Sequence, residues 1–131
     1  MPRFFPVFLF VACGLAQAET PRQIADAYAV AQGGGFTASA TRGGEFFAHR
    51  FGVSEKMPTC STCHTDNPMQ VGRHAVTGKS IKPVAPAANA ERLSDPAKVE
   101  KWFTRNCKEV VGRECTPGEK ADFMAFLIEA R

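Results

Sequence analysis

The sequence predicts an all-α domain of about four helices with long irregular loops. Apolar residues recur at helical spacing in several segments. Two of these segments open with Thr-Pro-x-Gln or Thr-Pro-x-Glu, at Thr20 and at Thr116, which is the pattern of a capping box with proline in the first turn. No segment alternates apolar and polar residues as a half-buried strand does. Together these observations favour helices over sheets.

Residues 1–18 have the pattern of a secretory signal peptide. Arg3 gives a positive start, thirteen largely apolar residues follow, and Ala16-Gln17-Ala18 has the small-x-small pattern of a cleavage site. The apolar stretch is shorter than the roughly 20 residues that span a bilayer. We expect cleavage after Ala18 and export of one mature domain, residues 19–131, to the periplasm.

Cys13 offers a competing interpretation of this segment, because a lipoprotein signal also ends at a cysteine. Phe10 is an unusual residue three positions before such a cysteine, so we expect Cys13 to be removed with the signal peptide.

Without Arg3 the formal charge of the mature domain falls from +3 to +2, which gives no indication of a nucleic-acid partner. The mature domain is expected to be a monomer.

The first two helices are predicted in the N-terminal part of the mature chain. The first begins after Thr20 and ends at three consecutive glycines, Gly33 to Gly35. A flexible connector rich in Gly, Ser and Thr follows. The second helix should contain Gly43 to His49, where Gly43 and Phe47 lie on one face. A glycine on that face would let another helix approach closely.

The third and fourth helices are predicted after a long irregular connection, Thr65 to Ala90, which contains several prolines and glycines. Such a connection is unusual in a compact domain unless it wraps around something. The third helix starts at Ser94-Asp95-Pro96 and ends near Asn106. The fourth starts at the Thr116 capping box and has a broad apolar face. The expected apolar face of the third helix consists of Val99, Trp102 and Phe103.

The segment Cys60-Ser61-Thr62-Cys63-His64 is a C-x-x-C-H pentad, the attachment signature of a c-type haem. The thiols of Cys60 and Cys63 can add across the two vinyl groups of one porphyrin. The imidazole of His64 can then bind the iron from below the ring. We therefore predict one covalently attached haem c, held by Cys60, Cys63 and His64.

Three other interpretations explain the two cysteines of the pentad. They could form a disulfide, a thioredoxin-like dithiol or half of a zinc site. None of these needs His64, and in an exported chain the haem interpretation is favoured. If Cys60 and Cys63 hold haem, Cys107 and Cys115 are left to pair with each other in an oxidising compartment. A backbone carbonyl of the long connection, with Pro83 among the candidates, is expected to accept the other nitrogen of His64.

The order of these elements resembles class I cytochromes c. In that family an early helix with a glycine and an aromatic residue precedes the haem pentad, and a C-terminal helix crosses this early helix. The chain is similar, more specifically, to the Sphaeroides haem protein family of small monohaem cytochromes c, over roughly Arg42 to Leu127. The loop from Asp66 to Val76 matches that family poorly. The matching runs are Thr77-Gly78-Lys79, Val99-Glu100-Lys101-Trp102, Arg105-Asn106-Cys107 and Cys115-Thr116-Pro117-Gly118-Glu119-Lys120-Ala121-Asp122.

The resemblance implies a class I cytochrome c-like fold around the haem, and it implies that Asn106 is the distal iron ligand. By itself an asparagine at a helix end is most often a cap. An amide is a hard ligand that suits ferric better than ferrous iron, so reduction should release it. The other candidates for the distal iron ligand are weaker. Met124 is expected in the core, and Met57 and Met69 are badly placed relative to the pentad. His49 and His74 are expected at the surface.

Two functions follow from these assignments. In the first, implied by the resemblance, reduction releases Asn106 and the ferrous iron binds a diatomic ligand (O2, NO or CO). A dihaem cytochrome c and a membrane b-type cytochrome are the implied redox partners. In the second, the protein is a plain periplasmic electron-transfer cytochrome c with six-coordinate iron in both redox states. The sequence leaves open whether an enzymatic oxygen- or nitric oxide-handling activity accompanies the first function.

Overall fold

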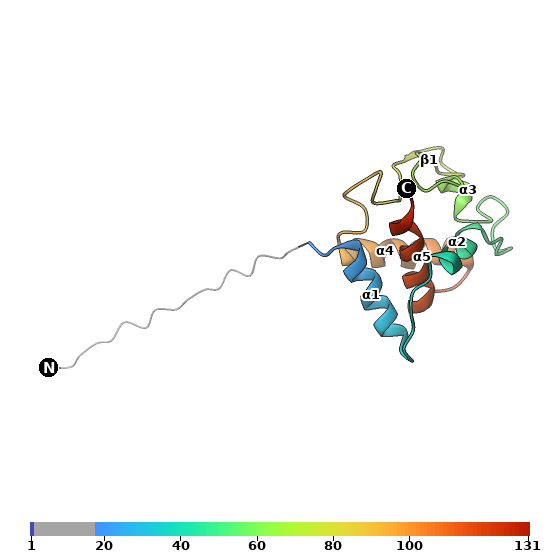
Figure 1. Ribbon diagram of the computed structural model, residues 1–131. Helices are drawn as coiled ribbons and strands as arrows, with labels where there is room; N and C mark the ends of the chain where they lie inside the picture. Colours follow the sequence, from blue (N-terminus) through green and yellow to red (C-terminus); the bar gives the residue numbers. More distant parts are fainter. Residues whose placement is uncertain (2–17) are drawn as a thin grey trace.

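The computed structural model describes Met1 and residues 18–131, so the predicted signal peptide lies almost wholly outside the described residues. The described part is mostly helical (Figure 1), as predicted, and within it no helix is long and apolar enough to cross a membrane. The elements in chain order are α1 (Pro21–Gln32), α2 (Ala40–Ala48), α3 (Ser61–His64), β1 (Gly72–Arg73), β2 (Ser80–Ile81), α4 (Pro96–Asn106), a π-helical turn η1 (Cys107–Val111) and α5 (Pro117–Glu129).

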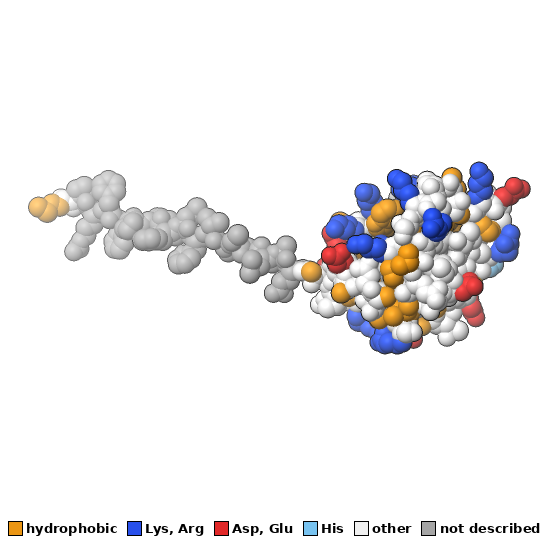
Figure 2. Space-filling view, turned by 90° about the horizontal axis from the view of Figure 1, so that it is seen from above, with side chains coloured by type: hydrophobic (Ala, Val, Ile, Leu, Met, Phe, Trp, Pro, Cys, Tyr) orange, Lys and Arg blue, Asp and Glu red, His pale blue; other side chains and the backbone are white. Residues whose placement is uncertain are grey.

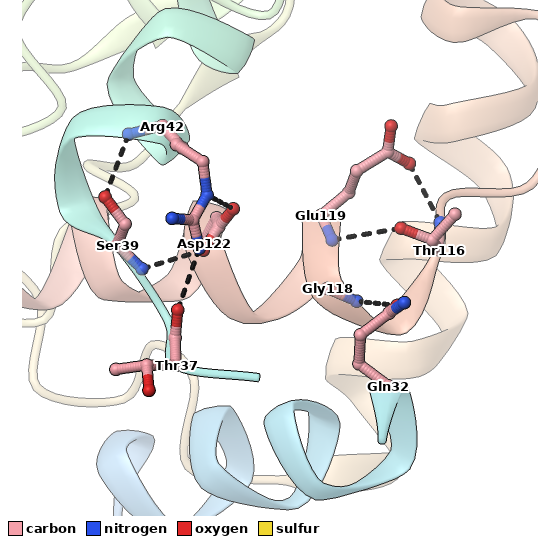
Figure 3. A network of polar contacts seen from close by, with 8 residues as sticks. All are labelled: Gln32, Thr37, Ser39, Arg42, Thr116, Gly118, Glu119 and Asp122. Atoms are coloured by element: carbon pink, nitrogen blue, oxygen red, sulfur yellow. Dashed lines mark hydrogen bonds and ion pairs between the residues drawn. The ribbon is translucent and has the colours of Figure 1, made fainter. Parts of the chain in front are cut away.

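Both predicted capping boxes are present, at the starts of α1 and α5. The Thr20 hydroxyl accepts a hydrogen bond from the Gln23 backbone at 3.2 Å, and the Thr116 hydroxyl accepts one from the Glu119 backbone at 3.1 Å. In each case the side chain three residues on accepts from the backbone of the cap. The end of α1 is tied to the start of α5, because the Gln32 side chain accepts a hydrogen bond from the Gly118 backbone at 2.7 Å (Figure 3).

α2 packs closely against α5 at Gly43. Gly43 is buried there, and a Cβ at this position would collide with the Asp122 backbone carbonyl and lie 2.9 Å from Cβ of Phe126. The predicted close approach is therefore confirmed. The Asp122 carboxylate is itself buried and accepts hydrogen bonds from the Arg42 guanidinium at 2.7 and 2.8 Å and from the Ser39 backbone at 2.7 Å (Figure 3).

The main hydrophobic core lies between α1, α4 and α5. Met124 is fully buried there, as predicted, together with Ile24, Ala25 and Val99. Phe103 packs against this core. Trp102 does not: it is 45% exposed, with the Arg105 guanidinium carbon 5.7 Å from its ring centroid, so its predicted place on the apolar face was wrong. Adjacent positions on a helix point about 100° apart, and here only one of the two aromatic residues faces the core.

Three features depart from the prediction. The second helix begins at Ala40, within the expected connector, and its C-cap is His49. The long connection contains a small antiparallel hairpin in which Gly72 pairs with Ile81 and Arg73 with Ser80. The chain does not leave the helical conformation near Asn106, where the third helix was expected to end, but continues as a π-helical turn to Val111, with Gly112 as a left-handed C-cap at φ +82°. The strands of the hairpin have only two residues each, too few for any alternating pattern to be visible in the sequence.

Candidate haem site

The pentad forms a single helical turn, α3, that brings its three functional side chains together. The backbone N–H of His64 donates to the Cys60 carbonyl at 3.2 Å, and that of Cys63 donates to the same carbonyl at 3.3 Å. The hydroxyl of the buried Thr59 accepts a hydrogen bond from the Thr62 backbone at 3.0 Å and so supports the first turn. Residues three and four apart on a helix lie on one face. The turn therefore presents both sulfurs and the imidazole together.

Cys60 and Cys63 are both free thiols, which argues against a disulfide between them. Burial raises the pKa of the Cys60 thiol to about 12, whereas a reactive redox dithiol needs a lowered pKa. No cluster of three or more His, Cys, Asp or Glu side chains suited to a metal ion is present among residues 18–131, so a zinc site has too few ligands. The structure thus weakens all three alternatives to haem.

The His64 imidazole is prepared to bind a metal ion as a neutral ligand. Burial above all, together with the positive charges of Arg92 and His74, lowers its pKa to about 4. At neutral pH the ring therefore has an unprotonated nitrogen available. The predicted hydrogen bond to Pro83 is not observed: the Pro83 carbonyl accepts from Arg92 at 3.0 Å and from Asn89 at 3.4 Å.

A series of aromatic rings connects α3 with α4 through α2 and α5. The Phe47 centroid lies 6.4 Å from that of His64 and 5.8 Å from that of Phe123. The Phe123 centroid in turn lies 5.6 Å from that of Phe103 on α4. A porphyrin is a flat apolar ring, so aromatic side chains beside the imidazole fit it. Phe123 and Phe103 have no signal in the sequence for this role, because helical spacing identifies them only as core residues.

Asn106 is the last residue of α4 and lies half-buried, one turn beyond Phe103. No hydrogen bond joins it to His64 within the described residues, and the aromatic series that starts at His64 ends at Phe103, on the same helix as Asn106. The chain remains helical through Asn106, with φ −71° and ψ −34°, and its side chain caps no helix end. The C-cap of this helical segment is Gly112 and not Asn106. Asn106 therefore has no capping role in the structure.

The two remaining cysteines form a disulfide directly after Asn106. Cys107 and Cys115 are bonded, with their Cα atoms 5.8 Å apart, and both side chains are buried. Together with Val111 they make a second small core, against which Phe46, Phe51 and Phe103 pack. The bridge closes the π-helical turn onto the start of α5. His49 is exposed, as predicted, whereas His74 is half-buried and its Nδ1 accepts hydrogen bonds from the backbones of Val76 and Thr77.

A helical domain with a C-x-x-C-H turn beside an aromatic series is the architecture of a c-type cytochrome. Comparison with known proteins agrees. Residues 33–127 match the family described as domain of unknown function (DUF1924). The cytochrome c-type protein SHP of Cereibacter sphaeroides is 44% identical over 114 residues, which are 86% of each chain. Cytochrome c'' of Methylophilus methylotrophus is 46% identical over 91 residues, which are 69% of this chain and 63% of that protein.

Solved structures show the same relationship. The structure of oxidized SHP, an oxygen-binding cytochrome c, superposes with a TM-score of 0.78 at 43% identity and covers 84% of this chain and 96% of SHP. The solution structure of cytochrome c'', which concerns the structural basis of haem-ligand detachment, gives a TM-score of 0.69 at 37% identity over 83% of this chain and 92% of that chain. The chain belongs to the DUF1924 family of cytochromes c, with SHP and cytochrome c'' as relatives. Haem c is accordingly its cofactor.

Proposed function

We propose that this protein is a periplasmic monohaem cytochrome c with a labile asparagine ligand. Cys60 and Cys63 attach the single haem covalently, His64 is the proximal ligand, and Asn106 is the distal ligand of the ferric iron. Reduction by one electron would release Asn106, and the haem would then supply a position at which O2, NO or CO can bind. A dihaem cytochrome c and a membrane b-type cytochrome supply the electron. The haem provides the one-electron chemistry and the position at which a diatomic ligand binds.

The observation that carries this proposal is the position of Asn106 at the end of α4. Its backbone is helical and its amide caps no helix end, so the side chain is free for another role. The alternative donors fit less well, because Met124 is fully buried in the core and the imidazole of His74 is engaged by two backbone N–H groups. Oxygen binding in SHP and haem-ligand detachment in cytochrome c'' support the same proposal by relationship.

Addition of CO to the dithionite-reduced protein tests the central step. We expect rapid and complete binding, seen as a change of the whole absorption spectrum, because a released amide leaves no strong-field ligand to displace. The measurement is a CO titration together with a stopped-flow binding rate. A reduced spectrum that CO leaves unchanged would overturn the proposal and leave a plain electron-transfer cytochrome with six-coordinate iron.

Replacing Asn106 by alanine tests the ligand itself. We expect the ferric protein to show a five-coordinate or water-bound spectrum, since the methyl group of alanine offers no donor atom. Thr104→Ala is the matched control, because Thr104 is also half-buried on α4 and should leave the ferric spectrum as in the wild type. If Asn106→Ala and the wild type had the same ferric absorption and resonance Raman spectra, another residue would be the ligand.

A further inference from the structure

The hairpin formed by residues 71–82, here called the basic hairpin, lies directly against the pentad. Gly72 is buried at its base, where a Cβ would collide with the Cys63 carbonyl and lie 3.1 Å from Cα of His64. The Ala75 backbone N–H points at the Cys63 sulfur, at 3.2 Å. This sulfur is one of the two that would be bonded to the edge of the haem. The basic hairpin is therefore an exposed segment directly beside that bond.

The basic hairpin carries positive charge that no neighbouring acid neutralises. Arg73, Lys79 and Lys82 are exposed, and residues 71–82 contain no Asp or Glu. Within residues 18–131, none of the three forms an ion pair, although Lys98 and Lys108 do. Figure 2 views the molecule from the side on which β1 and α3 lie in Figure 1, and on this face Lys and Arg side chains, together with some Asp and Glu side chains, lie around exposed hydrophobic side chains.

The basic hairpin also exposes apolar side chains beside its charges. Val71 is 61% exposed and Val76 is 52% exposed, so both lie beside the charged side chains at the surface of the hairpin. An apolar centre with a charged rim is the composition of a protein docking surface. Weak electron-transfer encounters use small surfaces of this kind, so a twelve-residue hairpin is large enough to contribute a major part of one.

The tip of the basic hairpin is held rigid by its own hydrogen bonds. The His74 backbone donates to the Lys79 carbonyl at 2.8 Å, and the Gly78 backbone donates to the His74 carbonyl at 2.8 Å. The Arg73 guanidinium donates to the Gly78 carbonyl at 2.8 Å. Because these contacts fix the backbone before a partner arrives, docking costs little ordering entropy. The hairpin is thus a preformed surface.

We propose that the basic hairpin is the docking surface for an acidic electron-transfer protein. The inference rests on the proposed function, because it assigns the route by which one electron reaches the haem. In the encounter the partner's reduced cofactor would lose one electron and the ferric haem would gain it; release of Asn106 would follow as a separate step. Arg73, Lys79 and Lys82 steer the acidic partner, and Val71 and Val76 contact it. An anionic membrane is the less favoured occupant, because two valines bury too little apolar surface to hold a protein there.

Reduction by flavodoxin, an acidic one-electron flavoprotein, provides the first test. We expect the double variant Lys79→Glu/Lys82→Glu to be reduced about tenfold more slowly than the wild type at low ionic strength, and the difference to shrink as salt is added. The matched control is Arg22→Glu/Lys98→Glu, which makes the same change of net charge at exposed positions of α1 and α4. Equal slowing in both double variants would show that only net charge acts, and no slowing would exclude the surface; either result overturns the inference.

A second test maps the contact without electron transfer. Oxidised flavodoxin added to the isotopically labelled protein should shift amide resonances of residues 71–82 and leave those of α1 unchanged. Binding of the same residues to phosphatidylglycerol vesicles but not to flavodoxin would overturn the inference in favour of a membrane. CO binding distinguishes a failure of this inference from a failure of the proposed function. We expect both reduced double variants to bind CO as the wild type does. If the reduced wild-type protein did not bind CO, only the proposed function would fail.

Discussion

Replacing Gly43 by alanine is expected to destabilise the protein by about 3 kcal/mol. The added methyl group would overlap the Asp122 carbonyl and crowd Cβ of Phe126, so α2 and α5 would have to move apart. That movement would also stretch the hydrogen bonds from Arg42 to the buried Asp122 carboxylate. The loss is expected despite the better helix propensity of alanine, which alone would stabilise α2 by about 1 kcal/mol. Denaturant unfolding of the haem-loaded protein measures it.

Gly44→Ala is the control for this prediction. Gly44 lies in the same helix, and a Cβ there meets only ring atoms of the Phe126 side chain, at 3.2 Å and beyond. A side chain can adjust where a backbone carbonyl cannot, so this variant should remain within about 1 kcal/mol of the wild type. Equal stabilities for the two variants would show that the α2–α5 contact tolerates a wider crossing than the structure indicates.

Removing the disulfide by replacing Cys107 and Cys115 with alanine is expected to cost about 2.5 kcal/mol of stability, from the chain freedom that a nine-residue loop regains in the unfolded state. A second effect should appear at the site. Without the bridge the π-helical turn loses its tie to α5, so Asn106 should bind the ferric iron less tightly and a water-bound fraction should appear. Ferric absorption and denaturant unfolding measure the two effects on the same sample.

Glu114→Ala, an exposed change inside the same loop, is the control for the disulfide variant and should alter neither quantity. If the double alanine variant lost stability but kept the ferric spectrum and the CO-binding rate of the wild type, the bridge would serve stability only.

The parts of the fold that the sequence predicted are those with local causes. The capping boxes at Thr20 and Thr116 and the cap at Asp95 place their helix starts by contacts within four residues, and the structure confirms all three. The π-helical turn after Cys107 has no such local signal. It is held by the bridge to Cys115 and by core packing, which spacing alone does not reveal.

The residues of the candidate site also divide into those predicted from a local motif and those that depend on how the helices and loops pack. Cys60, Cys63 and His64 were predicted from one contiguous motif, and one helical turn places them together. The aromatic series of Phe47, Phe123 and Phe103 depends on how three helices cross, and therefore could not be predicted from spacing. The position of Gly72 beside Cys63 could not be predicted either, because it depends on where a hairpin folds back. Asn106 was assigned by resemblance, since an asparagine at a helix end carries no chemical signature.

The short bridge beside Asn106 has a consequence for competition at the iron. If Asn106 ligates the iron as proposed, the amide that leaves remains attached between α4 and Cys107, whose bond to Cys115 spans only eight positions in sequence. Such a tethered group has an effective concentration in the millimolar range or above. A gas molecule would then compete with a ligand that never diffuses away, and its apparent affinity would fall by the fraction of protein in which Asn106 is bound. Changes of length in the segment 107–115 would therefore tune gas affinity without altering any residue that touches the gas.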